Sequence, residues 1–171
     1  DRLCLVQVCF GDDIAHLLQL SKQPEEKPKN LIKLLKNKSI TKIFHYGRFD
    51  LAMLNKNVGP VVGPIYCTKI ASKLSRTFGA KHGLKDLCKD LLNIELDKFN
   101  QTSDWGANKL SKNQLAYAAQ DVLFLHKLKI KLDEILLREG KMNLALECFE
   151  SLKTRVKLDL EGFQELDIFA H

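Results

Sequence analysis

Short apolar runs bounded by turn residues dominate the first part of the chain. Residues 3–10 form an apolar, partly β-branched run that ends at Gly11, and a second apolar run covers residues 14–20. Two such runs joined by a turn predict a β-hairpin. Residues 42–45 predict a third strand, which ends before Gly47. The strands therefore come early in the chain.

Helical spacing of apolar residues begins after the predicted hairpin. Residues 21–30 carry two prolines and several charges and predict a surface loop. Residues 31–36 and 49–54 each predict a helix. The region 67–92 predicts two short helices, which are separated around residues 79–83.

The longest predicted helix begins at Ser111. The sequence Ser-Lys-Asn-Gln is typical of a capping box, and the apolar periodicity continues to about Glu139, before Gly140. A further helix is predicted for residues 143–155. Early strands and late helices, without an internal repeat or a linker, predict one α/β domain over residues 1–171.

Composition narrows the class of protein. The chain has 171 residues, 45% apolar and 28% charged, which is typical of a soluble globular domain. No apolar run reaches the roughly 18 residues of a membrane span, and the first residues do not resemble a signal peptide. The five scattered cysteines lack a Cys-x-x-Cys pair and indicate reduced thiols in a cytoplasmic protein. The net charge of +6 moderately favours a polyanionic partner.

Tyr117 and Asp121 are four residues apart on the long predicted helix and therefore share one face. That face continues through apolar residues at Phe124, Leu125 and Leu128. A carboxylate buried in such a stripe is destabilising unless it is paired or bound to a metal. Taken alone, a buried aspartate that caps or pairs with a neighbour explains Asp121 better than a catalytic role.

Asp50 lies at the predicted junction between a strand and a helix. Such a junction opens into a cleft at the edge of a sheet, but aspartate is also a favoured residue at a helix start. Residues 45–51 by themselves are therefore a weak indication of function.

The two motifs together are more specific. Residues 44–50 read Phe-His-x-Gly-x-Phe-Asp and residues 117–122 read Tyr-Ala-Ala-x-Asp-Val. They resemble the second and third motifs of the DEDDy 3′→5′ exonucleases, the ribonuclease D family, which also includes DNA polymerase proofreading domains. The resemblance covers almost the whole chain and is closest to the nano-RNase C (NrnC) branch. The segments that carry it are residues 2–7, 41–45, 67–74, 81–85, 103–105 and 158–171.

The resemblance implies a ribonuclease H-like (DnaQ-like exonuclease) fold, a mixed sheet flanked by helices. It also implies that four acidic residues hold two divalent ions, Mg²⁺ or Mn²⁺, around the scissile phosphate. Hard oxygen ligands suit these ions. Asp50 and Asp121 match two of the four acids, and Tyr117 matches the tyrosine that orients the attacking water.

The other two acids of the family belong to an Asp-x-Glu motif on the strand before residues 3–10. This sequence begins after that motif, so we expect an N-terminally incomplete exonuclease domain without its first, central strand. The alternative is a version that has lost two ligands. Asp12 and Asp13 are no substitute, because they are adjacent and follow the strand.

Four further residues are candidates for substrate binding. Lys81 and His82 precede a predicted helix whose start favours a phosphate, although a charged surface turn is an equal alternative. Trp105 offers a face on which a base can stack, or packs against the long helix. His45 lies close to Asp50 in sequence and so near the expected cleft.

The last residues are too apolar for a free end, which predicts that they dock on the domain or on a neighbouring subunit. The apolar residues are Leu158, Leu160, Phe163, Leu166, Ile168 and Phe169. The resemblance to NrnC implies a ring-shaped homo-oligomer.

These observations predict a metal-dependent 3′→5′ exoribonuclease that degrades very short RNA, with dinucleotides as the substrate class, to 5′-mononucleotides. The alternatives are a ribonuclease D-like enzyme that trims structured RNA and an exonuclease that acts on single-stranded DNA ends. A catalytically inactive relative that binds nucleic acid is the alternative from another class.

Overall fold

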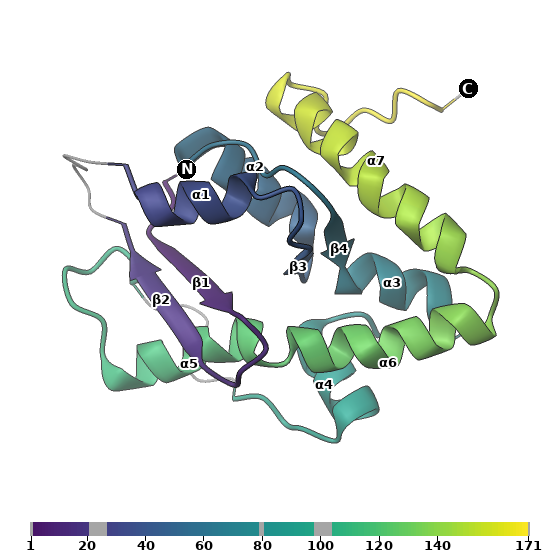
Figure 1. The fold of residues 1–171 in the computed structure, drawn as a ribbon, viewed down its shortest axis with the longest axis horizontal. Helices are drawn as coiled ribbons and strands as arrows, with labels where there is room; N and C mark the ends of the chain where they lie inside the picture. The colour runs from purple at the N-terminus through teal and green to yellow at the C-terminus, as the bar shows by residue number, and fades with distance from the viewer. Residues whose placement is uncertain (1, 21–26, 79–80, 98–103, 171) are drawn as a thin grey trace.

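The computed structural model describes residues 2–20, 27–78, 81–97 and 104–170. Strands dominate the first part of the chain and helices the remainder, as the sequence predicts (Figure 1). Residues 21–26 of the predicted surface loop and Gly79, at the predicted break between two helices, lie outside the described residues.

The predicted hairpin is confirmed. Strands β1 (Leu5–Cys9) and β2 (Ala15–Gln19) pair antiparallel, with Leu5 opposite Gln19 and Cys9 opposite Ala15. Gly11 in the turn has φ +86, and a Cβ added there would lie 3.1 Å from the His126 ring. The turn thus needs glycine both for its backbone conformation and for its close approach to a later helix.

A second pair of strands lies at the centre of the molecule. Strand β3 (Lys42–Phe44) pairs parallel with β4 (Ile65–Cys67), and helix α2 (Gly47–Asn57) connects them. The prediction for residues 67–92 did not include β4, because a three-residue apolar run is too short to show a period. In place of one continuous mixed sheet, the described residues form two separate two-stranded sheets, one antiparallel and one parallel.

Several helices follow the predicted pattern closely. Helices α1 (Lys29–Lys36), α3 (Thr68–Ser75) and α4 (Leu84–Leu92) each cover a predicted segment. Helix α2 begins at Gly47, two residues before the predicted start. The last helix, α7 (Met142–Leu160), is longer at both ends than predicted.

The prediction of one long helix from Ser111 to Glu139 was wrong. The chain forms α5 (Lys112–Leu123) and α6 (Leu125–Arg138), separated at Phe124. The predicted capping box is present, because Gln114 N donates to Ser111 Oγ at 3.2 Å and Ser111 N donates to Gln114 Oε1 at 2.9 Å. Helix α5 packs on the hairpin and α6 on α3 and α4, so the different packing partners account for the break (Figure 1).

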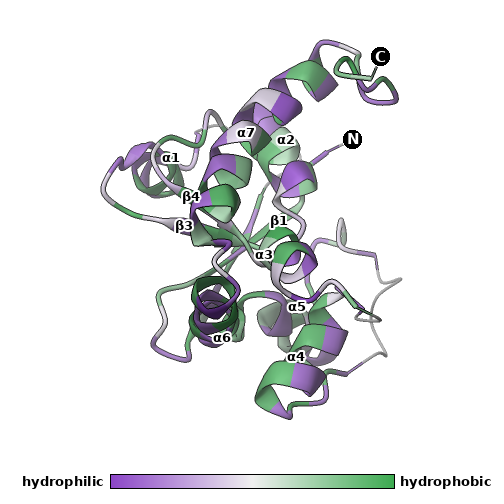
Figure 2. Cartoon of the chain, turned by 90° about the vertical axis from the view of Figure 1, so that its right-hand side faces the viewer, coloured by the Kyte–Doolittle hydropathy of each residue, from purple (hydrophilic) through white to green (hydrophobic). Residues whose placement is uncertain are grey.

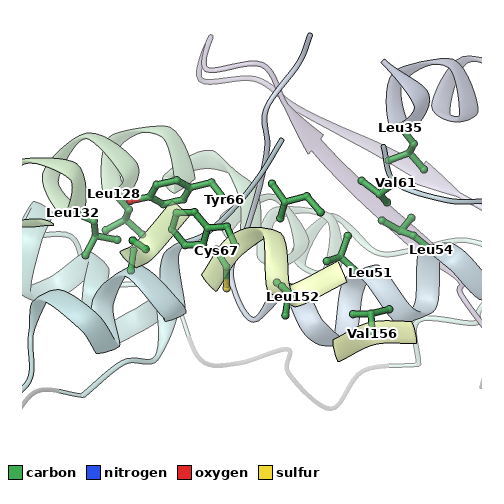
Figure 3. Close-up of a cluster of buried hydrophobic side chains, with 14 of the residues drawn as sticks. Leu35, Leu51, Leu54, Val61, Tyr66, Cys67, Leu128, Leu132, Leu152 and Val156 are labelled. Carbon is green, nitrogen blue, oxygen red and sulfur yellow. The ribbon is translucent and has the colours of Figure 1, made fainter. Parts of the chain in front are cut away.

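The core joins the parallel strand pair to α2, α6 and α7. Leu51 of α2 lies beside Leu152 and Val156 of α7, and all three are buried (Figure 3). The ring of Tyr66 in β4 packs on Phe149, with ring centroids 4.6 Å apart. Full burial of an aliphatic side chain such as Leu51 contributes about 1.5–3 kcal/mol to the free energy of unfolding. Hydrophobic and hydrophilic stretches alternate along α4 and α7, as expected for helices with one face in solvent (Figure 2).

All five cysteines are free thiols, of which Cys67 and Cys88 are buried and three are half-buried. A membrane-crossing helix would have to be longer and more apolar than any helix in the described parts of the chain.

Candidate active site

A cavity of about 450 Å³ separates the hairpin from the parallel strand pair. Its walls come from β1, from β3 with the following turn, from the first turns of α2, and from the junction between α5 and α6. Asp50, Asp121 and His45 lie among otherwise mostly apolar lining residues. The structure thus brings together two carboxylates that are 71 positions apart in the sequence.

Asp50 belongs to the first turn of α2 and is half-buried in the cavity wall. Its carboxylate forms no hydrogen bond or ion pair with any of the described residues. Burial raises its pKa to about 7, and the charge of Asp121 adds to this effect. The protein therefore disfavours the ionised form of Asp50 in the absence of a nearby cation.

Asp121 is exposed to solvent, and the expectation of an aspartate buried in an apolar stripe was wrong. The apolar residues Leu125 and Leu128 that follow are buried in α6, whereas Asp121 in the last turn of α5 is not. Although solvent reaches the carboxylate, protein surrounds most of it, and this desolvation raises its pKa. The positive charge of Lys85 opposes the shift.

Tyr117 lies one turn before Asp121 and lines a second cavity of about 310 Å³. This cavity shares Asp121 and Leu84 with the first and extends to Lys85. Burial and the charge of Asp121 raise the pKa of the Tyr117 hydroxyl, so the group stays protonated at neutral pH and can donate a hydrogen bond. The ring of Trp105 lies beside Tyr117, with centroids 6.1 Å apart, as the packing alternative predicts.

His45 is held in one tautomer by the start of α3. Its Nδ1 lies 2.9 Å from Thr68 Oγ1, and the Thr68 hydroxyl donates to the carbonyl oxygen of Phe44 at 3.2 Å. The hydroxyl proton is thereby used, so Nδ1–H of His45 is the donor, and Nε2 is left as an acceptor. Burial, together with the charge of Lys69, lowers the pKa of His45 to about 4. The ring is neutral at physiological pH.

Lys81 and His82 line neither cavity. Nδ1 of His82 lies 2.8 Å from Ser72 Oγ on α3, and Arg76 donates to the Lys81 carbonyl oxygen at 3.3 Å. Burial and the charges of Arg76 and nearby lysines lower the pKa of His82. The segment forms a basic surface beside α3, so its role in substrate binding stays a prediction.

The carboxylate pair fits a divalent cation. Two partly desolvated carboxylates without a hydrogen bond or ion pair to the described residues are electrostatically unfavourable, and a cation between them reduces the repulsion. Oxygen ligands match the preference of Mg²⁺ and Mn²⁺. No group of three or more histidine, cysteine, aspartate or glutamate side chains that could hold a metal ion is found in the described ranges. Asp50 and Asp121 are two carboxylates that line this cavity, and their role as metal ligands stays a prediction.

Two lining residues were missed in the sequence. Lys85 influences Asp121, although the two lie on different helices, and nothing local in the sequence connects them. Phe49 lines the cavity and is 57% exposed. Its position next to Asp50 in the Phe-His-x-Gly-x-Phe-Asp motif is the signal in the sequence that it lies at the site.

Comparison with known proteins assigns the class. A model of the 3′-5′ exonuclease family matches residues 1–137, and the chain therefore belongs to that family. Ribonuclease D of Acidiphilium cryptum is 33% identical over 146 residues, which cover 85% of this chain and 36% of the relative. DNA polymerase I of Aquifex aeolicus is 36% identical over 137 residues, which cover 80% of this chain and 22% of the relative. The chain thus spans about a third or less of the length of these relatives.

Among solved structures, Brucella melitensis NrnC superposes with a TM-score of 0.94 and 52% identity, covering 99% of this chain and 82% of that one. That protein has also been solved with Mg²⁺ and with pGG. Escherichia coli RNase D superposes with a TM-score of 0.77 and 26% identity, over 90% of this chain and 40% of that one. The predicted family and the DnaQ-like, ribonuclease H-like fold are confirmed.

Proposed function

We propose that this chain is the catalytic domain, over residues 1–171, of a metal-dependent 3′→5′ exoribonuclease that degrades very short RNA to 5′-mononucleotides. The observation that carries the proposal is the pair Asp50 and Asp121, two carboxylates that line one cavity and form no hydrogen bond or ion pair with the described residues. Dinucleotides are the proposed substrates, which is supported by the 52% identity to NrnC and by the binding of pGG to that protein.

In the proposed reaction, Asp50 and Asp121 supply two of the carboxylate ligands for two divalent ions, Mg²⁺ or Mn²⁺. Such ions, when bound, stabilise the negative charge on the attacking and leaving oxygens of a phosphodiester. Tyr117 holds the attacking water by a hydrogen bond, because its hydroxyl is protonated and lies one turn from Asp121. His45 Nε2 accepts a hydrogen bond from the substrate at the cavity wall.

Substrate binding is proposed to involve the basic and aromatic groups at the edge of the site. Lys81 and His82 belong to a basic segment that attracts phosphates. Trp105, beside Tyr117, offers an aromatic face to a base.

We further propose a cytoplasmic homo-oligomer, arranged as a ring. Support comes from the tail, where Leu166 is 55% and Phe169 is 73% exposed in the described chain, and Phe163 and Ile168 are exposed as well. Light scattering on the purified protein measures the mass of the assembly, and a monomer would contradict this proposal. The free thiols are compatible with a reducing compartment.

The test uses the native gene product, with any residues that precede Asp1. Cleavage of a 5′-labelled dinucleotide, the corresponding deoxydinucleotide and a longer single-stranded RNA is compared in Mg²⁺. We expect the ribodinucleotide to be the preferred substrate. Tyr117→Phe should lower kcat about 10²-fold with an unchanged requirement for Mg²⁺, and Asp121→Asn should abolish cleavage.

The matched control is Glu134→Gln, which neutralises an exposed carboxylate on α6 and should leave cleavage unchanged. Full activity of Asp121→Asn would contradict the metal assignment. Preference for the longer RNA would contradict the short-substrate proposal, and preference for the deoxydinucleotide would indicate a DNA exonuclease.

A further inference from the structure

Arg48 connects the first turn of α2 to the last turn of α7. Its Nε donates to Asp159 Oδ2 at 2.6 Å and its Nη2 donates to Asp159 Oδ1 at 2.8 Å. Asp159 is buried, and the hydrogen bonds from Arg48 are the main reason that its pKa is lowered. A bidentate pair of this kind fixes both position and orientation, which a single contact does not.

The same carboxylate belongs to a larger cluster, here called the Asp159 cluster: Arg48, Arg155, Asp159 and Gln164. Arg155 Nε donates to Asp159 Oδ1 at 3.0 Å, and both arginines donate to the carbonyl oxygen of Gln164, at 2.7 and 3.0 Å. The Gln164 side chain donates back to the Asp159 carbonyl oxygen at 3.0 Å. The cluster is therefore closed on itself and holds α2, α7 and the tail together.

Leu51 of α2 packs against α7 in the core, but few polar contacts fix the rotation of the helix at its start. The residue before it, Tyr46, has a left-handed backbone with φ 63, and no side chain caps the helix. Free N–H groups in an uncapped first turn leave that turn prone to fraying. Among the described residues, Arg48 makes polar side-chain contacts from this turn to other parts of the chain, to Asp159 on α7 and to the carbonyl oxygen of Gln164 in the tail.

Arg48 and Asp50 point to opposite sides of this turn, because residues two apart on an α-helix are about 200° apart around the axis. Arg48 thus faces α7 while Asp50 faces the cavity. With a helix radius of about 5–6 Å including side chains, a rotation of roughly 10° moves the Asp50 carboxylate by about 1 Å. A displacement of this size is enough to disturb a catalytic geometry.

We propose that Asp159 is a positioning residue for Asp50. Acting through Arg48, it fixes the rotation of α2 and so sets the separation between Asp50 and Asp121 across the cavity. This inference rests on the proposed function, since it takes Asp50 and Asp121 as the cation ligands. It adds a residue of the last helix, 109 positions after Asp50, to the determinants of the site.

The test measures the binding of Mn²⁺ to the native gene product by the loss of the electron paramagnetic resonance signal of free Mn²⁺. The melting temperature of each variant is measured in EDTA. Arg48→Met and Asp159→Asn should each weaken Mn²⁺ binding about tenfold, a usual effect for a group that orients a ligand. Arg48→Lys keeps the charge but loses the bidentate geometry, so its effect should be intermediate. The double variant Arg48→Met/Asp159→Asn should bind Mn²⁺ no more weakly than the single variant with the lower affinity, because each change breaks the same pair of Arg48 and Asp159.

Two controls separate positioning from general stability. Glu150→Gln removes an exposed ion pair with Lys153 on the same helix and should bind Mn²⁺ like the wild type. Arg155→Met releases three tail carbonyl oxygens and one contact to Asp159 Oδ1 but keeps the bidentate pair of Arg48 and Asp159, so Mn²⁺ binding should change less than in Asp159→Asn.

The outcomes are distinguishable. If Arg48→Met and Asp159→Asn melt at lower temperature yet bind Mn²⁺ like the wild type, the cluster is merely structural and the inference is overturned. It is overturned also if Arg155→Met weakens binding as much as Asp159→Asn, because the tail would then be responsible. If the wild type itself does not bind Mn²⁺, the proposed function fails first.

Discussion

At the scale of single residues, the environment of each side chain decides what it can do, and much of that environment was not visible in the sequence. The spacing of Tyr117 and Asp121 correctly predicts that they share a helix, but not that Asp121 faces an open cavity. The position of His45 near the cleft is reproduced, whereas its bond to Thr68 links two elements that no local pattern connects.

The neutral state of His45 leads to a prediction about pH. Its folded pKa of about 4 lies below the unfolded value of 6.5, so the unfolded state binds more protons between these values. Stability contributed by neutral His45 is therefore present above pH 6.5 and is lost as the pH falls towards 4. Over this range the free energy of unfolding of the wild type should fall relative to that of His45→Asn by on the order of 1–3 kcal/mol.

Urea unfolding of the wild type and His45→Asn at several pH values in EDTA measures this difference. The control is His16→Asn, which makes the same change in an exposed side chain of β2. A pH-independent difference between wild type and His45→Asn would contradict the assignment of a buried neutral ring.

At the scale of elements, the sequence predicts type and order better than boundaries. The hairpin follows from two apolar runs around a turn, and Ser111 correctly predicts the start of α5. The break at Phe124 arises because α5 and α6 pack on different neighbours. The sequence has no proline or glycine at this position that would predict it. Strand β4 was not predicted, because its three residues show no sequence period and form a strand by pairing with β3.

Gly47 at the start of α2 gives a prediction for this scale. A Cβ at this position would lie 3.0 Å from Phe44 Cβ and 3.4 Å from Leu152 Cδ2, so the helix start would have to move. Gly47→Ala should lower the free energy of unfolding by about 1–3 kcal/mol and reduce dinucleotide cleavage. Lys56→Ala, exposed in the last turn of the same helix, should change neither. Normal stability and cleavage in Gly47→Ala would show that α2 tolerates the shift.

At the scale of the whole molecule, the candidate site depends on contacts between distant parts of the chain. Asp50 comes from the first third and Asp121 from the last, and the Asp159 cluster joins α2 to the end of the chain. The two motifs were sufficient to predict the family, because their residue types and order are specific. The Asp159 cluster was not predictable, since arginine and aspartate on an amphipathic helix are ordinary surface residues until the fold places them together.

The central claim is that Asp50 and Asp121 together hold divalent cations, and the most direct measurement is the melting temperature of wild type and Asp50→Asn at pH 8, in EDTA and in Mg²⁺. Because burial raises the pKa of Asp50 to about 7, its ionised form destabilises the metal-free protein at this pH. Mg²⁺ binding to the folded state alone should raise the melting temperature of the wild type. Asp50→Asn should melt above the wild type in EDTA and should lose the response to Mg²⁺. A variant that keeps the full Mg²⁺ response, or that melts below the wild type in EDTA, would contradict the account.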